Sequence, residues 1–212
     1  KYQTQHIPLK AKYPGGFDAL FLLGFMNQLP STLSEKDRPA IDALSSDQLW
    51  QNCQDTIKRS IGLFEQAGYD LEVEDYHFTI LLGNPEKPML QLNKGYSGDG
   101  GIPGYLMLSL LPNDYTLPRV QAALAHECNH NVRFQFVKWN QQTTLADWVV
   151  SEGLAESFAA ELYGKDLIGP WVTSTSPEQL EEIKPIISSQ LQLTGMAEMA
   201  PYLYGDEIAK IQ

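Results

Sequence analysis

The stretch LAHECNHNVRF, from Leu124 to Phe134, holds two of the four histidines of this 212-residue chain. His126 and His130 are four positions apart, and Glu127 directly follows the first of them. On an α-helix, residues four apart project from one face, so both imidazoles can reach a single metal ion. The pattern His-Glu-x-x-His therefore predicts that the two histidines bind Zn²⁺ and that Glu127 is the general base toward a water molecule.

The alternative interpretation is an ordinary amphipathic helix that carries two histidines by coincidence. A strongly apolar setting argues against it, because it places the imidazoles in or beside the interior, where groups without partners would be costly. The apolar neighbours are Val120, Ala123, Leu124, Val132, Phe134 and Phe136.

A catalytic zinc ion also needs a third protein ligand and one position open to water. No third histidine follows at the short spacing of the metzincin pattern, and His6 and His77 lie upstream in unsuitable contexts. The next predicted helix instead carries Glu152 and Glu156, which share a helix face. Glu152 follows His130 by 22 positions, which leaves room for a loop and an antiparallel return of the chain.

These two acids have different predicted roles. We expect Glu152 to be the third ligand and Glu156, one turn further on, to accept a hydrogen bond from a ligating imidazole. A solvated acidic helix face is the alternative, and the apolar residues Leu154, Ala155 and Phe158 between and beside the acids disfavour it.

The pattern of apolar residues and breakers predicts an α+β fold, in which helices precede strands and two long helices follow. The predicted helices cover residues 17–29, about 46–67, about 116–139, 145–163 and, as two helices parted near 194–195, 177–212. The predicted strands lie within 71–82 and over 105–111. The segments outside helices and strands are an extended arm at 1–14, a turn at 13–16, a polar connector at 31–39 and a glycine-rich loop at 95–104.

Composition excludes several classes of partner. The net charge of −11, with basic residues scattered singly, argues against nucleic acid and against an anionic membrane surface. The chain has no run of 18 apolar residues, so no membrane span is predicted, and we interpret the apolar patch at 19–26 as part of a core helix.

Cys53 and Cys128 are expected to be free thiols in a reducing compartment, which favours the cytoplasm. Since the chain begins at Lys1 without a methionine, we also expect a trimmed sequence.

Three segments carry a resemblance to a known family: Gly100–Tyr105, Leu124–His130 with Arg133, and Ser151–Glu156. Together they resemble the YjaZ-like group of predicted Zn-dependent proteases, a domain of unknown function, over roughly residues 70–210. The glutamate followed by Gly-x-Ala also looks like the glutamate-zincins (gluzincins), and this likeness implies Glu152 as the third ligand. Cys128-Asn129 departs from the bulkier residues expected in relatives, at positions that face away from the metal.

The resemblance implies further roles. A tyrosine close to a late glycine would stabilise the oxyanion, which makes Tyr204 the candidate and Tyr202 the reserve. The strand at 105–111 would be the edge strand to which an extended peptide adds, and a plain core strand is the alternative that the sequence leaves open. Arg133 is expected to anchor a carboxylate between two helices.

The sequence thus predicts one zincin-like catalytic domain over residues 1–212, with a small sheet packed on the zinc helix in a lobe at 1–139 and a helical lobe at 140–212. Its predicted function is that of a zinc metallopeptidase, a hydrolase that cleaves peptide bonds of peptide or protein substrates with a zinc-activated water. The alternative is a zincin-fold binding or regulatory protein with a structural or inactive metal site. A hydrolase of non-peptide substrates is a weaker alternative.

Overall fold

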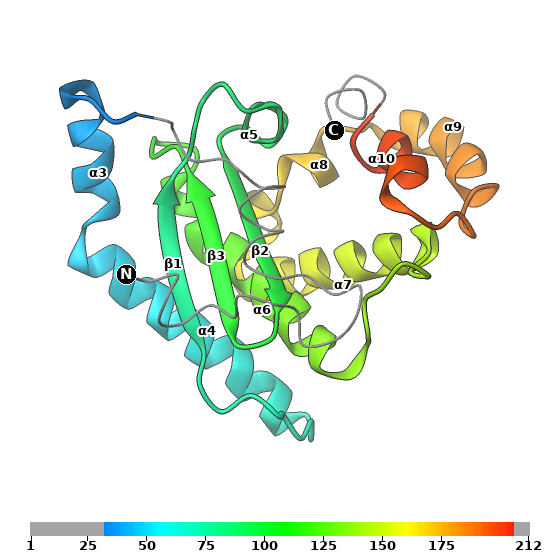
Figure 1. The fold of residues 1–212 in the computed structure, drawn as a ribbon, viewed down its shortest axis with the longest axis horizontal. Coiled ribbons are helices and arrows are strands. Elements are labelled where there is room, and N and C mark those ends of the chain that lie inside the picture. The colour runs from blue at the N-terminus through cyan, green and yellow to red at the C-terminus, as the bar shows by residue number, and fades with distance from the viewer. Residues whose placement is uncertain (1–31, 206–212) are drawn as a thin grey trace.

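Leucines at every second position of Tyr105–Leu110 produce strand β3, the middle strand of a small sheet (Figure 1). The computed structural model describes residues 32–205. Within them, β3 pairs in parallel with β1 (His77–Leu82) and in antiparallel fashion with β2 (Tyr96–Ile102), in the order β1-β3-β2. The predicted arm, the turn at 13–16 and the helix at 17–29 lie outside the described residues.

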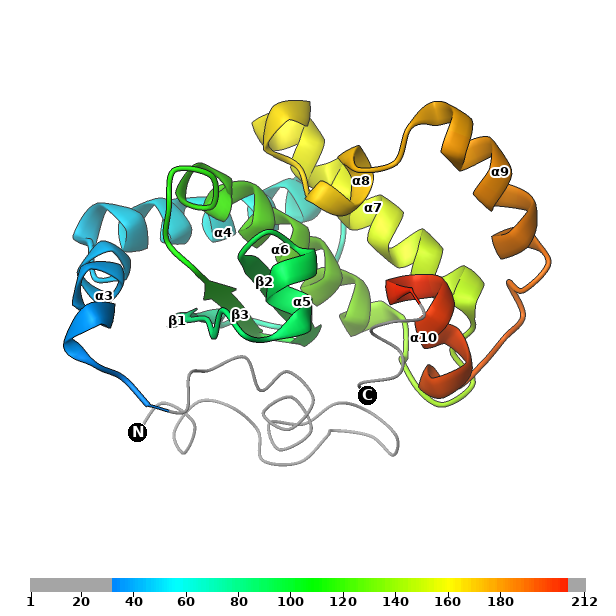
Figure 2. The ribbon, with the colours of Figure 1, turned by 90° about the horizontal axis from the view of Figure 1, so that it is seen from above.

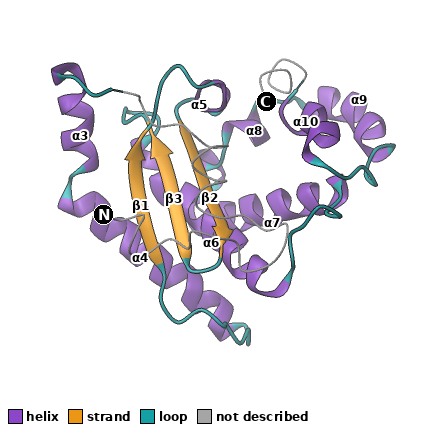
Figure 3. Cartoon of the chain, in the orientation of Figure 1, coloured by secondary structure: helices purple, strands orange, loops and turns teal. Residues whose placement is uncertain are grey.

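Helices precede and follow this sheet, so the predicted α+β class is confirmed (Figure 3). The helices are α3 (Arg38–Leu44), α4 (Asp47–Gln66), α5 (Pro88–Leu92), α6 (Val120–Phe136), α7 (Leu145–Tyr163), α8 (Pro170–Thr173), α9 (Pro177–Ser188) and α10 (Met196–Tyr204). Short 3-10 turns lie at Glu35–Asp37, Leu117–Arg119 and Lys165–Leu167. None of the helices in the described part of the chain combines the length and the apolar character needed to cross a membrane.

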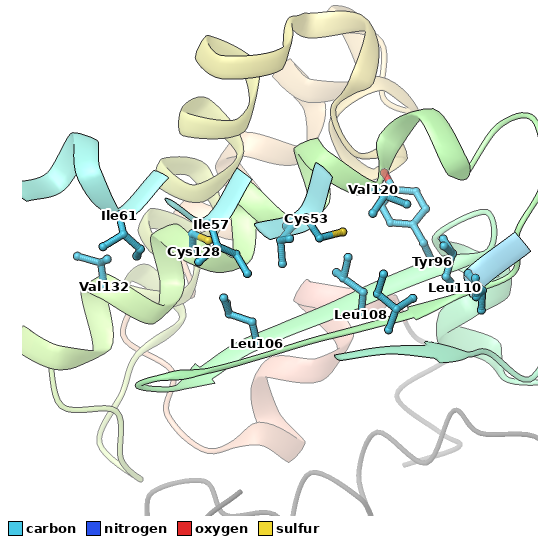
Figure 4. Close-up of a cluster of buried hydrophobic side chains, with 13 residues drawn as sticks. Cys53, Ile57, Ile61, Tyr96, Leu106, Leu108, Leu110, Val120, Cys128 and Val132 are labelled. Carbon is cyan, nitrogen blue, oxygen red and sulfur yellow. The ribbon is translucent and has the colours of Figure 1, made fainter. Parts of the chain in front are cut away.

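The core forms where α4 and α6 cover one face of the sheet, and Figure 2 shows both helices on the same side of the strands. Side chains from all three elements meet there (Figure 4). They are Cys53, Ile57 and Ile61 from α4, Leu106, Leu108 and Leu110 from β3, and Val120, Leu124, Cys128 and Val132 from α6. Val120, Leu124 and Val132 therefore attach α6 to the sheet, as their pattern predicted, whereas Phe136 is 50% exposed at the end of the helix.

The glycine-rich segment at 95–104 is a strand, so the prediction of a loop was wrong. Its glycines permit a close approach of β2 to α6. A Cβ atom at Gly98 would collide with the Glu127 carboxylate, and one at Gly100 would collide with the Glu127 backbone carbonyl. Glycine inside a strand commonly marks such a contact, and sequence alone does not distinguish it from a turn.

Strand β3 is paired on both sides, so the prediction that 105–111 is an edge strand was also wrong. Among residues 32–205, the edge strand beside α6 is β2, because β3 pairs with β2 on one side and with β1 on the other.

The remaining differences concern short elements. The connector at 31–39 contains a helical turn and the start of α3, and α5 and α8 had no periodic signal long enough to predict them. The first strand begins only at His77, and the zinc-motif helix ends at Phe136. The boundaries of α7, by contrast, are those predicted: Thr144 and Asp147 form a capping box at its start, and Gly164 ends it with a positive φ of 90°.

A buried asparagine fastens the β2–β3 hairpin to α6. Asn131 is 0% exposed, and its side-chain oxygen accepts a hydrogen bond from the Gly104 N–H at 2.8 Å. Its amide nitrogen donates toward the carbonyl oxygens of Gly100, Ile102 and Tyr105, which lie 2.8–3.0 Å away. One side chain therefore satisfies several buried backbone groups where the hairpin turns.

We expect Asn131→Ala to lower the free energy of unfolding by about 3 kcal/mol or more, because each buried polar group left without a partner costs about 1–3 kcal/mol. Asn129→Ala, two residues away at a half-buried position of α6, is the matched control and should cost less than about 1 kcal/mol. Urea denaturation of both variants measures the difference. Equal losses would show that Asn131 does not fasten the hairpin.

Both cysteines are free thiols, and both are fully buried in the core. Burial raises the pKa of Cys53 to about 12 and raises that of Cys128 as well, so neither forms a reactive thiolate near neutral pH.

A thiol reagent such as Ellman's reagent should therefore label neither cysteine in the native protein and both in denaturant. The chain has two cysteines, so the expected counts are zero and two thiols per chain. Rapid labelling of one thiol under native conditions would mean that the contact between α4 and α6 opens readily.

Candidate metal centre

Helices α6 and α7 pack against each other in antiparallel fashion, since His130 meets Ser151 and His126 meets Glu156. The four-residue spacing places both histidines on the face of α6 that meets α7. Glu152 comes from the facing side of α7. The structure thus brings together the two histidines and the acid that the sequence predicts as ligands.

The ligand atoms converge on one point. The Nε2 atoms of His126 and His130 are 3.0 Å apart, and the two oxygens of Glu152 each lie 3.3 Å from one of these nitrogens. A tetrahedral zinc ion with ordinary bond lengths separates its ligand atoms by about 3.3–3.5 Å. Two imidazole nitrogens and a carboxylate at this spacing therefore fit a zinc ion, and the three residues could hold a metal.

One side of this cluster is open to solvent. The side chains of His126 and His130 are 7% and 9% exposed, whereas that of Glu152 is 42% exposed. A metal ion held by the three residues would keep a position accessible from the Glu152 side, which a catalytic site requires and a structural site does not.

Glu156 fixes the ring of His126 from the other side. His126 Nδ1 lies 2.8 Å from Glu156 Oε2 and donates the hydrogen bond, because an ionised carboxylate only accepts. Burial by itself lowers the pKa of His126, but the hydrogen bonds with Glu152 and Glu156 outweigh it and raise the pKa to about 10. At this pKa the ring carries a proton on each nitrogen near neutral pH, with Nδ1 directed at Glu156 and Nε2 at Glu152, and a bound metal ion would replace the proton on Nε2.

His130 has a weaker partner on its outer nitrogen. The Ser151 hydroxyl is 3.2 Å from His130 Nδ1, and Ser151 is buried next to Glu152 in α7. Burial lowers the pKa of His130, so this imidazole is neutral near neutral pH and able to act as a ligand. The pKa of Glu152 is well below its usual range. Burial acts against this shift, but the positive charge that His130 carries at low pH and the hydrogen bonds with both histidines outweigh burial, so Glu152 is ionised near neutral pH.

Glu127 is buried on α6 with its carboxylate against Gly98 of β2. Burial raises its pKa to about 8, with a smaller contribution in the same direction from the charge of Asp99. A carboxyl group with a pKa near neutrality can both take up and release a proton under physiological conditions.

The other predicted site residues differ in their placement. Tyr204 ends α10, and burial together with the negative charge of Glu152 raises its pKa, so its hydroxyl is protonated and near the cluster. Tyr202 lies on the same helix and is half-buried. The expected ion pair of Arg133 is not seen within residues 32–205, where its Nε is buried without a hydrogen-bond partner. His77 stacks on Tyr105 in the sheet, with ring centroids 5.4 Å apart.

Three residues around the cluster were not predicted as part of the site: Ser151, Gly169 and Trp171. Gly169 donates its backbone N–H to Glu156 Oε1 at 2.6 Å, and the Trp171 indole donates to Glu156 Oε2 at 3.0 Å. The sequence could have indicated Ser151, since it directly precedes Glu152 in the motif. It gave no indication of Gly169 or Trp171, because a Gly-Pro-Trp sequence after a helix is typical of a turn.

Comparisons with known proteins agree with this site. A family model described as "Predicted Zn-dependent protease (DUF2268)" matches residues 49–212. The chain is 35% identical to "Uncharacterized protein YjfC" of Bacillus subtilis (strain 168) over 207 residues, which is 97% of this chain and 69% of that protein. It is 33% identical to "Uncharacterized protein YjaZ" of the same organism over 78 residues, which is 36% of this chain and 30% of the relative.

A search of solved structures found no significant match. The family match spans most of the chain and includes His126, His130 and Glu152, and the relatives confirm the resemblance to the YjaZ-like group. The chain therefore belongs to the DUF2268 family of predicted Zn-dependent proteases.

Proposed function

We propose that this protein is a zinc-dependent metallopeptidase of the gluzincin type, a hydrolase of peptide or protein substrates that acts in the cytoplasm through one zincin-like catalytic domain. One observation carries the proposal: His126, His130 and Glu152 converge at distances that suit zinc, and Glu127 is the immediate neighbour of the first histidine. The family's description as predicted proteases supports it.

In this proposal His126 Nε2, His130 Nε2 and one oxygen of Glu152 hold the zinc ion. When bound, zinc would lower the pKa of a water molecule and polarise the substrate carbonyl. The protein's part is to keep the three donors in place: Glu156 and Ser151 occupy the outer nitrogens of the two imidazoles, and neither ring can turn without losing a hydrogen bond.

Glu127 is the proposed general base. Its carboxylate would take the proton of the attacking water and deliver it to the leaving amine, which returns the residue to its starting state. The contact with Gly98 supports this role, because β2 limits where the carboxylate can lie while the glycine leaves the space it occupies. The pKa of about 8 suits a group that must accept and then donate a proton.

Tyr204 is the proposed donor to the oxyanion. Its hydroxyl stays protonated because burial and the charge of Glu152 raise its pKa, and a protonated phenol can donate to a developing negative charge. Tyr202 remains the reserve candidate on the same helix.

The substrate would bind in an extended conformation along β2. This strand is the edge of the described sheet and contacts Glu127, whereas β3 has both of its edges paired. Main-chain hydrogen bonds to an edge strand bind peptides without reading most side chains, so we propose a peptide backbone as the element that is recognised.

The ligand assignment predicts an order of zinc affinities. The purified protein should hold about one zinc ion per chain, and His126→Ala, His130→Ala or Glu152→Ala should abolish retention during mild chelation. Glu156→Ala should keep the ion with an affinity about 10–100-fold weaker, because it removes only the partner of a ligand. Elemental analysis and competition with a chelator measure both effects.

His77→Ala is the control, since it removes a histidine that lies in the sheet and should retain zinc in full. If Glu152→Ala bound zinc more tightly than Glu156→Ala, the ligand would be assigned one helical turn too early.

Glu127→Gln should retain zinc but reduce cleavage of a mixed peptide library by about 100-fold or more, because the base is lost while all three donors remain. Glu161→Gln, at an exposed position of α7, is the control and should cleave normally. Equal cleavage by the Glu127 variant and wild type would exclude Glu127 as base. A wild-type protein that binds zinc but cleaves nothing would favour a binding or regulatory protein instead.

A further inference from the structure

Trp171 combines an exposed position with a directed hydrogen bond. It lies in α8, is 40% exposed, and nevertheless donates its indole N–H to Glu156 Oε2 at 3.0 Å. The indole N–H of a partly buried tryptophan usually finds a hydrogen-bond partner, and here the partner is the carboxylate that also binds His126. Its directional contact is therefore the feature that distinguishes this residue.

The hydrogen bond reaches the oxygen that holds His126. Glu156 Oε2 accepts from both Trp171 Nε1 and His126 Nδ1, and Glu156 Oε1 accepts from the Gly169 N–H. Three donors thus determine the position and rotation of one carboxylate. Without the indole N–H, Oε2 keeps a single donor, and the carboxylate can turn away from the imidazole that it orients.

The indole ring is itself held in place. A Cβ atom at Gly169 would collide with the ring of Trp171, so only glycine lets the tryptophan fold back over the preceding backbone. On its other sides the ring contacts Tyr96 and His126, with centroids 5.6 Å and 6.1 Å away. The contacts come from β2, α6 and the α7–α8 connection, and they leave the N–H directed at Glu156.

We propose that Trp171 is a positioning residue of the metal centre: its indole N–H fixes the Glu156 carboxylate, which in turn orients His126 toward the metal ion. This inference rests on the proposed zinc site. It adds α8, which contributes no ligand, to the parts of the chain that hold the proposed zinc site in place.

The test is the zinc affinity of Trp171→Phe, measured by competition with a chromophoric chelator on the full chain. The substitution keeps an aromatic ring and removes the N–H, and we expect the affinity to fall about 3–10-fold, less than for loss of Glu156 itself. Trp50→Phe is the matched control. It also removes an indole hydrogen bond, from Trp50 Nε1 to the Leu44 carbonyl oxygen, but in the first turn of α4. Its zinc affinity should stay within about twofold of wild type.

A double-mutant cycle separates positioning from a general effect on the fold. If Trp171 acts through Glu156, then Trp171→Phe should have no further effect on zinc affinity in a Glu156→Ala background. The absorption spectrum of bound Co²⁺ gives a second readout, because a change in the orientation of His126 alters the ligand field in both single variants. Additive losses in the cycle would overturn the proposal.

Gly169→Ala provides an independent variant should Trp171→Phe fold poorly. The added methyl group must displace the indole ring, so it should reproduce the loss of affinity and be silent in the Glu156→Ala background. Zinc bound by wild type and equally well by both variants would refute the role of Trp171 and leave the proposed function intact. A wild-type chain that binds no zinc would overturn both.

Discussion

The close approach of β2 to α6 is the constraint on which the rest of the structure depends. The backbone of Gly100 lies against the carbonyl of Glu127, and Gly98 lies against the carboxylate of the same residue. Asn131, one turn further along α6, binds the hairpin that follows β2. A larger residue in place of Gly98 or Gly100 would push β2 away from α6. The contact therefore sets both the packing of the core and the position of the Glu127 carboxylate beside His126.

The second determining contact is the antiparallel packing of α6 on α7, which solves an electrostatic problem. Two buried imidazoles and a buried glutamate would each be costly without a partner. Here each of these groups has a partner on the other helix: Glu156 binds His126, Ser151 lies beside His130, and Glu152 contacts both histidines. The helix period places these partners one turn apart on each helix, so a single register of the two helices satisfies them all.

The C-terminal helices surround the cluster although they provide none of the three residues that could hold a metal ion. Leu145 and Ala146 donate backbone hydrogen bonds to the segment before α10, which ties this helix to the start of α7 and leaves Tyr204 near Glu152. On the opposite side, α8 returns Trp171 to Glu156. The cluster is thereby surrounded by segments from β2 to α10, and its exposed side is that of Glu152.

The sequence by itself determined the α+β class, the boundaries of α7 and the group His126, His130 and Glu152, because helical periodicity is local and the spacing of four residues fixes which side chains share a face. Only the tertiary structure decided that residues 96–102 form an edge strand of the described sheet, that Asn131 binds a hairpin about 30 positions earlier, and that Trp171 donates to Glu156. Glycine marks a turn or a close contact equally well, and a polar side chain does not indicate its distant partner. These features depend on contacts between segments far apart in the chain, and such contacts exist only once α6 has packed against the sheet and α7.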